Sequence, residues 1–386
     1  MLNQLAKRIF DITPFHVMEI LRLAKQLEMQ GRDVIHMEIG EPDFSTPQTI
    51  VEAGLKQLRT GNIKYTPAAG LPELRQKIAD HYLARHRLKI DKARIFITPG
   101  ASGAFLLAFG ATLNPGDGLL MADPCYPCNS NFARLFESTA QTVPVGSITN
   151  YQLTPDLIEE HWGVSTKGVL IASPSNPTGT LINAHTLQQC IETIDRLGGY
   201  FFSDEIYHGL VYGEQAPTAL EFSDHAFVIN SFSKYFGMTG WRIGWLIVPD
   251  GFVDAAEKLA QNIYISAATL SQYAAIAAFD EENIKELERR RSEFAARRDF
   301  LYNELIKLGF EIPVKPDGAF YIYADCSKLS GDSYRFALGL LEKEGVAVTP
   351  GLDFGNHQPG RHVRFAYTTS IERMADAMQR LERFIR

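Results

Sequence analysis

Residues 230–244 place a lysine among groups that bind anions. The segment reads N-S-F-S-K-Y-F-G-M-T-G-W-R-I-G and follows an apolar run at 226–229 that predicts a strand. At the mouth of a buried strand, the Lys234 side chain can lose its proton and become an amine nucleophile, able to form a Schiff base with a carbonyl. Three neighbours can contact an anion: Ser231, Ser233 and Arg242. The alternative is an ordinary solvated lysine in a loop, because lysine side chains are mostly exposed.

Four other predicted turns carry a polar or aromatic residue just after a strand: Ser102, Tyr126, Asn176 and Asp204. Ser102 lies in P-G-A-S-G at 99–103, a strand-turn-helix segment that points backbone N–H groups at an anion but is neither a Walker A loop nor G-x-G-x-x-G. Asp204 ends an aromatic strand, so its carboxylate needs a cation or an N–H partner; the alternative is a helix cap. Because α/β proteins bind ligands at the carboxyl ends of their strands, these turns and that of Lys234 predict one site at one sheet edge.

Two further features each allow more than one role. Tyr65, in the loop G-N-I-K-Y-T-P-A-A-G at 61–70, either packs as a plug or hydrogen-bonds a ligand. Cys125 and Cys128 form a C-x-x-C, but a structural zinc site needs a second pair or nearby histidines, so we predict no metal site. A thioredoxin-like redox pair is the alternative, although prolines at 124 and 127 favour a rigid loop over a helix start.

The elements that must position these residues alternate along the chain. Strands are predicted at 34–39, 94–98, 118–122, 169–172, 200–202, 226–229 and 243–248, and helices at 14–30, 48–59, 71–87, 104–113 and 187–197. This alternation is typical of a mostly parallel sheet covered by helices, an α/β domain. Residues 270–308 are predicted to be helical and are heavily charged at 281–291. Short strands at 320–323 and 346–348 with a helix between them, a strand at 361–367 and a helix at 371–386 predict a smaller α+β domain.

Composition narrows the class of protein. The chain has 386 residues, of which 45% are hydrophobic and 22% charged, as expected of a soluble globular protein. Its net charge of -7 argues against a nucleic-acid partner. Residues 1–10 lack the apolar core of a secretory signal, no apolar run is long enough to span a membrane, and four cysteines fit a reducing compartment. We therefore expect a cytoplasmic protein with no membrane or nucleic-acid partner.

Four motifs in order give the chain a family resemblance. They are S-P-S-N-P-T-G at 173–179, D-E-I-Y at 204–207, S-F-S-K at 231–234 and G-W-R-I-G at 240–244. Together they resemble the class I/II aminotransferases, enzymes of fold type I that use pyridoxal 5′-phosphate (PLP). The resemblance runs from G-E-P-D-F at 40–44 to R-F-A-Y at 364–367 and implies a large PLP-binding domain at 46–284. A small domain would comprise 1–45 and 285–386.

The resemblance also implies roles near the PLP ring. Lys234 resembles the lysine that holds PLP and later moves the α-proton, and Asp204 the partner of the ring nitrogen. Tyr207 and Asn176 resemble the pair that bonds the phenolic oxygen, and Tyr126 the aromatic stacked on the ring. Lys234, Asp204 and Tyr207 are thus the predicted catalytic residues.

The remaining implied roles concern phosphate and substrate. The phosphate would be bound by Ala101, Ser102, Ser231 and Arg242, with Ser233 as a further contact. Tyr65 resembles a tyrosine that reaches the phosphate of the other subunit, which implies a homodimer. Arg364 resembles the arginine that binds the substrate α-carboxylate, next to the Gly40 backbone and Asn176.

The implied activity is transfer of the α-amino group of an amino acid to a 2-oxo acid, 2-oxoglutarate or pyruvate, in a ping-pong cycle. A PLP-dependent carbon–sulfur lyase, an enzyme like aminocyclopropane-carboxylate synthase, or a catalytically silent PLP-binding regulatory module are the alternatives. A dicarboxylate donor needs a second cation to bind its side-chain carboxylate. Lys64, Arg22 and His16 are candidates, but nothing in the sequence assigns this role to any of them. Residues 12–15 are expected to form an apolar lid, which favours a neutral or aromatic donor.

Overall fold

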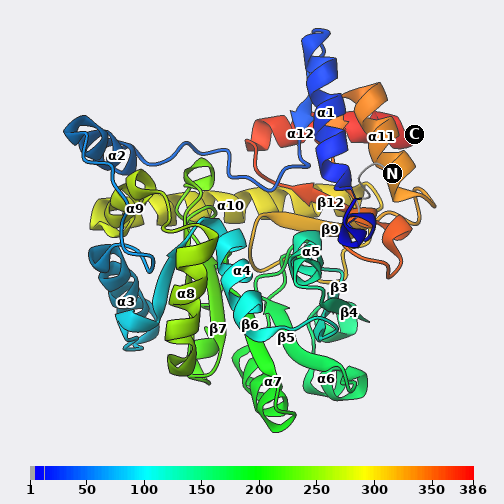
Figure 1. Ribbon diagram of the computed structural model, residues 1–386. Helices are drawn as coiled ribbons and strands as arrows, with labels where there is room; N and C mark the ends of the chain where they lie inside the picture. The colour runs from blue at the N-terminus through cyan, green and yellow to red at the C-terminus, as the bar shows by residue number, and fades with distance from the viewer. Residues whose placement is uncertain (1–4, 13) are drawn as a thin grey trace.

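A seven-stranded sheet forms the centre of the computed structural model, which describes residues 5–12 and 14–386 (Figure 1). Predictions that involve residues 1–4 and 13 lie outside that range. The strand order is β2-β8-β7-β6-β5-β3-β4. The bounds are β2 (Ile95–Thr98), β3 (Gly118–Asp123), β4 (Thr139–Pro144), β5 (Thr166–Ala172), β6 (Tyr200–Asp204), β7 (Phe227–Ser231) and β8 (Gly244–Ile247). β8 is antiparallel to both neighbours and every other pair is parallel, which confirms the predicted mostly parallel sheet.

Helices cover both faces of this sheet because its strands are apolar on both sides. In β2, Ile95 and Ile97 pack into the core on one face and Phe96 into the core on the other. The first face is covered by α3 (Pro72–His86), α6 (Pro155–His161) and α7 (Ala184–Arg196). The second is covered by α4 (Gly100–Thr112), α5 (Pro127–Leu135) and α8 (Val253–Ile263).

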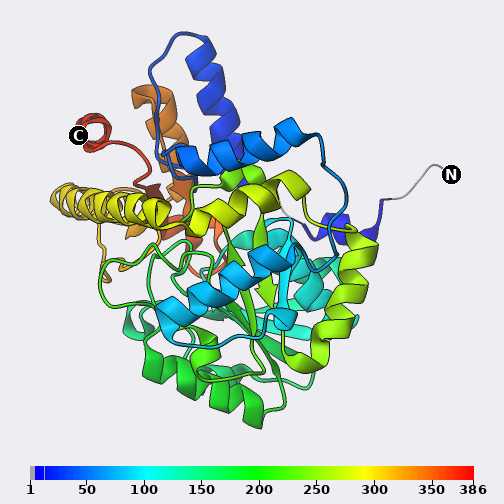
Figure 2. The same ribbon diagram turned by 90° about the vertical axis from the view of Figure 1, so that its left-hand side faces the viewer.

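The two ends of the chain build a smaller part together. β11 (Thr349–Pro350), β12 (His362–Ala366) and β9 (Tyr321–Asp325) form an antiparallel sheet, and β1 (Ile35–His36) pairs with β10 (Val346–Ala347). The N-terminal helix α1 (His16–Met29) stands beside α11 (Ser333–Glu344), which in turn packs against α12 (Ile371–Ile385) (Figures 1 and 2). This pairing of the ends agrees with the predicted small domain, whose boundaries at 45/46 and 284/285 stay a prediction.

Three further helices complete the fold of the described residues. α2 (Gln48–Thr60) packs against α9 (Thr269–Ile276), and the long α10 (Glu281–Lys307) follows. The stretch at 270–308, predicted to be helical, consists of α9 and α10, which a 3₁₀ turn at Ala277–Phe279 and an extended Asp280 separate. β4 was not predicted, because at the edge of the sheet most of its side chains are exposed and polar.

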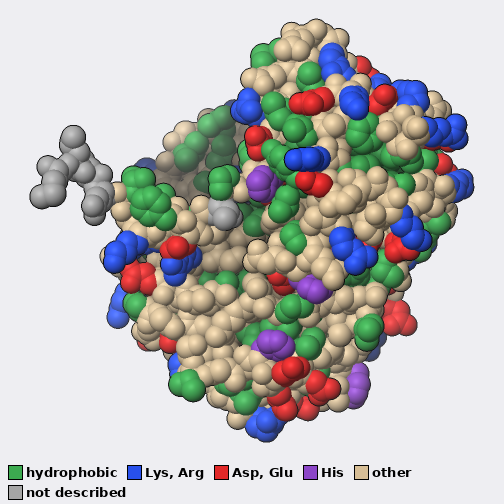
Figure 3. All heavy atoms as spheres, turned by 90° about the vertical axis from the view of Figure 1, so that its right-hand side faces the viewer, with side chains coloured by type: hydrophobic (Ala, Val, Ile, Leu, Met, Phe, Trp, Pro, Cys, Tyr) green, Lys and Arg blue, Asp and Glu red, His purple; other side chains and the backbone are tan. Residues whose placement is uncertain are grey.

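The surface carries charges of both signs. On the face drawn in Figure 3, Lys and Arg are interspersed with Asp and Glu rather than gathered into one field. Within residues 5–12 and 14–386, no helix is both long enough and apolar enough to cross a membrane.

Candidate active site

A cavity of about 250 Å³ opens where the carboxyl ends of β5, β6 and β7 meet the C-terminal part of the chain. The structure brings most of the predicted site residues to its wall: Gly40, Ala101, Ser102, Tyr126, Asn176, Asp204, Tyr207, Ser231, Ser233, Lys234, Arg242 and Arg364. The cavity thus lies at the predicted edge of the sheet.

Lys234 is held in the cavity by the backbone of the N-terminal segment. It follows β7, and its Nζ donates a hydrogen bond to the Gly40 carbonyl oxygen at 2.6 Å. The rings of Tyr207 and Phe320 lie 5.9 and 5.8 Å from Nζ. Burial lowers the pKa of Lys234 to about 8. About a tenth of this lysine is therefore a free amine at pH 7, far more than at the usual lysine pKa, and a free amine is what a nucleophile and proton carrier requires.

Asp204 presents a carboxylate that lacks a cation partner in the described residues. It is the last residue of β6 and is 5% exposed. Its one hydrogen bond there comes from the backbone N–H of Ile206, at 3.3 Å. Burial raises the pKa of Asp204 to about 7. Such a group favours a ligand that brings a proton on nitrogen to this point of the cavity.

Hydroxyl and N–H groups gather at the start of α4. Ala101 and Ser102 lie in its first turn, where unpaired N–H groups and the helix dipole favour an anion. Ser231 Oγ lies 3.0 Å from Ser233 Oγ. A Cβ at Gly100 would lie 2.7 Å from Arg242 Nη2, so the absence of a side chain there lets the guanidinium approach the helix. This arrangement fits a phosphate.

Arg364 is a buried cation for which the described residues supply no carboxylate. The residue is 3% exposed, and its Nη1 donates to Asn176 Oδ1 at 2.9 Å. Its Nη2 donates to the Glu38 carbonyl oxygen and, at 3.2 Å, to Thr349 Oγ1, while its Nε has no partner there. A buried charge without a counter-ion is unfavourable, so this guanidinium favours a bound anion such as a carboxylate.

Tyr207 is paired with a residue to which sequence reasoning gave no role. Its hydroxyl lies 2.8 Å from the hydroxyl of Tyr321, the first residue of β9, which also lines the cavity. A side chain at Gly40 would collide with the Tyr321 hydroxyl, which explains the glycine. The available signal was Tyr321 itself, an amphipathic side chain in the strand predicted at 320–323.

One wall of the cavity is apolar and comes from the N-terminal segment. Phe15, Val17, Met18 and Leu21 line it, and the Phe15 ring meets that of Tyr126 edge-on at 6.2 Å. Asp353 holds this segment, since its two carboxylate oxygens accept the backbone N–H groups of His16 and Val17, both at 2.7 Å. Sequence reasoning placed the lid at 12–15; the structure extends the apolar wall into α1.

Neither Tyr65 nor the cysteine pair lines the cavity. Tyr65 is 81% exposed. Cys125 lies in the loop before α5, as expected, but Cys128 is the second residue of that helix, because Pro127 begins α5 and a proline suits that position. Burial raises the pKa of Cys125 to about 12 and also raises that of Cys128, which disfavours a reactive thiolate. Within residues 5–12 and 14–386, no cluster of His, Cys, Asp and Glu is suited to hold a metal.

Comparison with known proteins agrees with this geometry. Residues 32–381 match the family model for aminotransferase class I and II. The chain is 38% identical to the (5-formylfuran-3-yl)methyl phosphate transaminase of Methanocaldococcus jannaschii, with 99% of each chain covered. It is 37% identical to the valine–pyruvate aminotransferase of Mycobacterium tuberculosis, with 96% of each covered. A crystal structure of aspartate aminotransferase from Thermotoga maritima superposes with a TM-score of 0.92 at 35% identity, covering 98% of this chain and 99% of the other.

The chain therefore belongs to the class I and II aminotransferases, and it is an aminotransferase of fold type I. Its cofactor is PLP, which combines a phosphate, a ring nitrogen and an aldehyde. The cavity fits these groups, since it offers the α4 cradle, the Asp204 carboxylate and the Lys234 amine. When bound, PLP supplies an electron-withdrawing ring that stabilises negative charge on the α-carbon of an amino acid.

Proposed function

We propose that this aminotransferase takes a neutral or aromatic amino acid as its donor and a 2-oxo acid, pyruvate or 2-oxoglutarate, as its acceptor. The observation that carries the proposal is the composition of the cavity wall. Among the described residues that line it, the cations are Lys234, Arg242 and Arg364, each with a proposed task. The α1 side of the cavity is apolar, so a donor side chain that reaches it gains by burying apolar surface.

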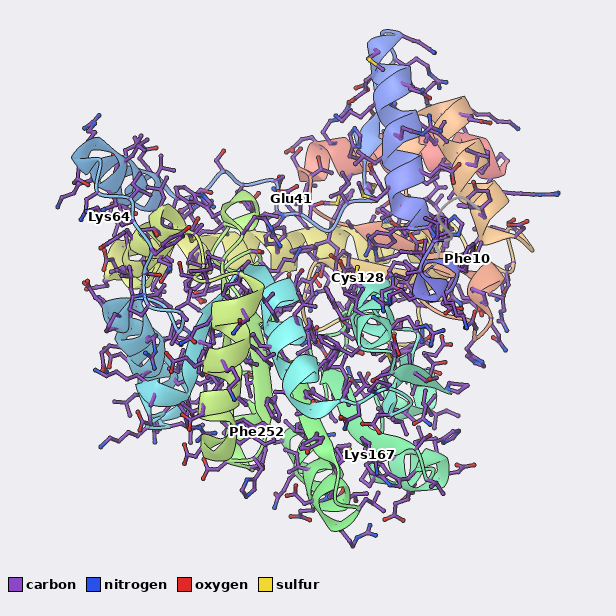
Figure 4. The ribbon with its side chains drawn as sticks, viewed as in Figure 1. Phe10, Glu41, Lys64, Cys128, Lys167 and Phe252 are labelled. Carbon is purple, nitrogen blue, oxygen red and sulfur yellow. The ribbon has the colours of Figure 1, made fainter. Side chains whose placement is uncertain are left out.

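The cation candidates for a second carboxylate lie elsewhere in this subunit. Lys64 lies beside α2 at one end of the molecule, far from Cys128 at the start of α5, which is near the centre (Figure 4). Arg22 donates to Gln26 on the exposed side of α1, and the His16 ring stacks edge-on against Tyr334. None of the three lines the cavity. Pyruvate is favoured over 2-oxoglutarate as the acceptor for the same reason, because the second carboxylate of 2-oxoglutarate would also lack a cation.

In the proposed reaction each residue has one task. Arg364 binds the donor's α-carboxylate, which brings the α-carbon towards Lys234. The Lys234 amine takes the α-proton and later returns it. Asp204 keeps a proton on the ring nitrogen, Tyr207 and Asn176 hydrogen-bond the phenolic oxygen, and Tyr126 stacks on the ring. The phosphate is held by Ala101, Ser102, Ser231, Ser233 and Arg242.

A panel of amino donors tests the donor class. The PLP-loaded protein is mixed with phenylalanine, alanine, valine or aspartate without an acceptor, and the loss of its visible absorbance is followed. We expect phenylalanine or a neutral donor to react at least tenfold more efficiently than aspartate, because one buried apolar side chain contributes about 1.5–3 kcal/mol. Aspartate as the best donor would contradict the proposal and point to a cation from a second subunit. Steady release of pyruvate and ammonia from one amino acid would instead indicate a lyase.

The proposal includes a homodimer in the cytoplasm. Tyr65 is exposed, and apolar side chains near it are exposed as well: Leu55, Leu58, Ile63, Ile263 and Ile265. Exposed apolar side chains on neighbouring elements are typical of a subunit interface. We propose that this surface pairs with a second copy and that Tyr65 reaches the phosphate in the other subunit. The free cysteines agree with a reducing compartment.

A further inference from the structure

Tyr321 contacts both halves of the proposed site. It is 1% exposed, yet it lines the cavity from the first position of β9. Its hydroxyl lies 2.8 Å from that of Tyr207, and the centre of its ring lies 4.3 Å from Arg364 Cζ. The missing side chain of Gly40 makes room for its hydroxyl. One residue therefore joins the tyrosine proposed for the cofactor to the arginine proposed for the substrate.

We propose that Tyr321 is a positioning residue with two tasks: its hydroxyl directs the proton of Tyr207 into the cavity, and its ring holds the Arg364 guanidinium in place. The inference rests on the function proposed above, because it assumes the roles given there to Tyr207 and Arg364.

The hydroxyl of Tyr207 can make only one hydrogen bond as a donor. A phenol has one proton, so Tyr207 donates either to Tyr321 or to a group in the cavity. Within the described residues Tyr321 is the only hydrogen-bond partner of the Tyr207 hydroxyl. When Tyr321 donates to Tyr207, the Tyr207 proton becomes available to the cofactor's phenolic oxygen. Tyr321 suits this direction because burial raises the pKa of Tyr207 well above its usual value and raises that of Tyr321 less, which makes Tyr321 the stronger donor of the two.

The ring of Tyr321 helps to hold the Arg364 guanidinium in place. Its partners are neutral oxygens from Asn176, Glu38 and Thr349, none of which pairs with its charge. The faces of aromatic rings attract a guanidinium, and the centres of the Tyr321 and Phe354 rings lie 4.3 and 4.8 Å from Cζ. Tyr321 is thus the contact that stabilises the charge on the side of the cavity, where the donor carboxylate binds.

Two variants separate the two tasks, and a third is the control. Tyr321→Phe removes the hydroxyl and keeps the ring, while Tyr321→Leu removes both. Tyr323→Phe makes the same chemical change two residues along β9, at a buried tyrosine that does not line the cavity. Thermal melting of each PLP-loaded variant checks that it is folded, and Tyr321→Phe retains the shape of the core.

The first measurement is the pH midpoint of the visible absorbance of the PLP-loaded protein without any ligand. A hydrogen bond from Tyr207 stabilises negative charge on the cofactor's phenolic oxygen. This favours the deprotonated form of the bound cofactor, so it lowers the pH midpoint of the absorbance. In Tyr321→Phe and Tyr321→Leu the midpoint should rise by about half a pH unit, as expected for a weakened neutral hydrogen bond. It should not move in Tyr323→Phe.

The second measurement is the dissociation constant of 3-phenylpropionate, an unreactive carboxylate with an aromatic side chain. Tyr321→Phe should bind it within about twofold of the wild type, and Tyr321→Leu about five- to tenfold more weakly, because only the latter loses the ring over Arg364. An unchanged midpoint in Tyr321→Phe, or unchanged binding in Tyr321→Leu, would overturn the proposal. If the wild type preferred succinate to 3-phenylpropionate, the proposed donor class would fail, while the midpoint test of Tyr321 would still stand.

Discussion

Asp204 shows how a site residue can destabilise the protein that carries it. The carboxylate is buried beside one backbone N–H, and burial raises its pKa from 3.8 to about 7. Between about pH 4 and 7 the folded protein therefore keeps a proton that the unfolded chain has released. Its contribution to stability thus falls as the pH rises through this range. A residue kept at such a cost is better explained by a ligand than by packing.

Replacing Asp204 should separate stability from function. In the cofactor-free protein, Asp204→Asn removes the buried charge, so at pH 8 it should raise the free energy of unfolding by about 2–4 kcal/mol. The gain should shrink towards pH 4, where Asp204 is protonated in the folded wild type. Urea unfolding at both pH values measures the effect, and PLP should stabilise the variant less than the wild type. A variant less stable than the wild type at pH 8 would contradict the assignment.

At the scale of elements, the sequence was most informative where a strand ends in a turn. The apolar runs before Asp204 and Lys234 predicted both strands, and parallel strands bring their carboxyl ends to one edge. The extent of the apolar wall could not be predicted, because it depends on Asp353 reaching α1 from more than 330 residues along the chain. The place of Tyr321 in the site could not be predicted for a similar reason, since its partner Tyr207 lies 114 residues away along the chain.

Asp353 should control the binding of large apolar donors. Asp353→Asn leaves one acceptor oxygen for the two N–H groups of α1 and removes a charge that favours its N-terminus. The KM for phenylalanine should rise about five- to tenfold with kcat little changed, because the lost cap contributes about 1 kcal/mol or more.

Asp332→Ala is the control for this prediction. Asp332 also caps a helix, but through one oxygen: its Oδ1 accepts the backbone N–H groups of both Tyr334 and Arg335 at the start of α11, so an asparagine there would keep the cap. Asp332 does not line the cavity. Both variants should melt at lower temperature, but only Asp353→Asn should change KM. An equal KM for phenylalanine in the two variants would show that α1 does not depend on Asp353.

At the scale of the whole molecule, one subunit supplies a nearly complete site. Tyr65 is the exception, since it is exposed and away from the cavity of its own chain. In a two-fold symmetric dimer the same surface meets itself, so each subunit can lend a residue to the other. The proposed exchange of Tyr65 makes the dimer part of the active site.

Mixing two weakened variants tests that exchange. Lys234→Ala should be inactive, and Tyr65→Ala should bind PLP weakly enough to be inactive at limiting cofactor. If the subunits are unfolded and refolded together, a mixed dimer has one site with both residues intact, and activity should return to about a quarter of the wild type. No recovery, with mixed dimers shown to form, would mean that each site uses its own Tyr65, and a fully active Tyr65→Ala would mean that no site uses it.

Chemical labelling can identify the lysine that binds the cofactor. The PLP-loaded protein is reduced with borohydride, which makes the bond between lysine and cofactor permanent, and then digested and mapped by mass spectrometry. We predict that the added mass lies on Lys234 and is lost, together with the visible absorbance, in Lys234→Ala. The cofactor's mass on any other lysine, or near-normal turnover by Lys234→Ala, would contradict the assignment of this cavity as the active site.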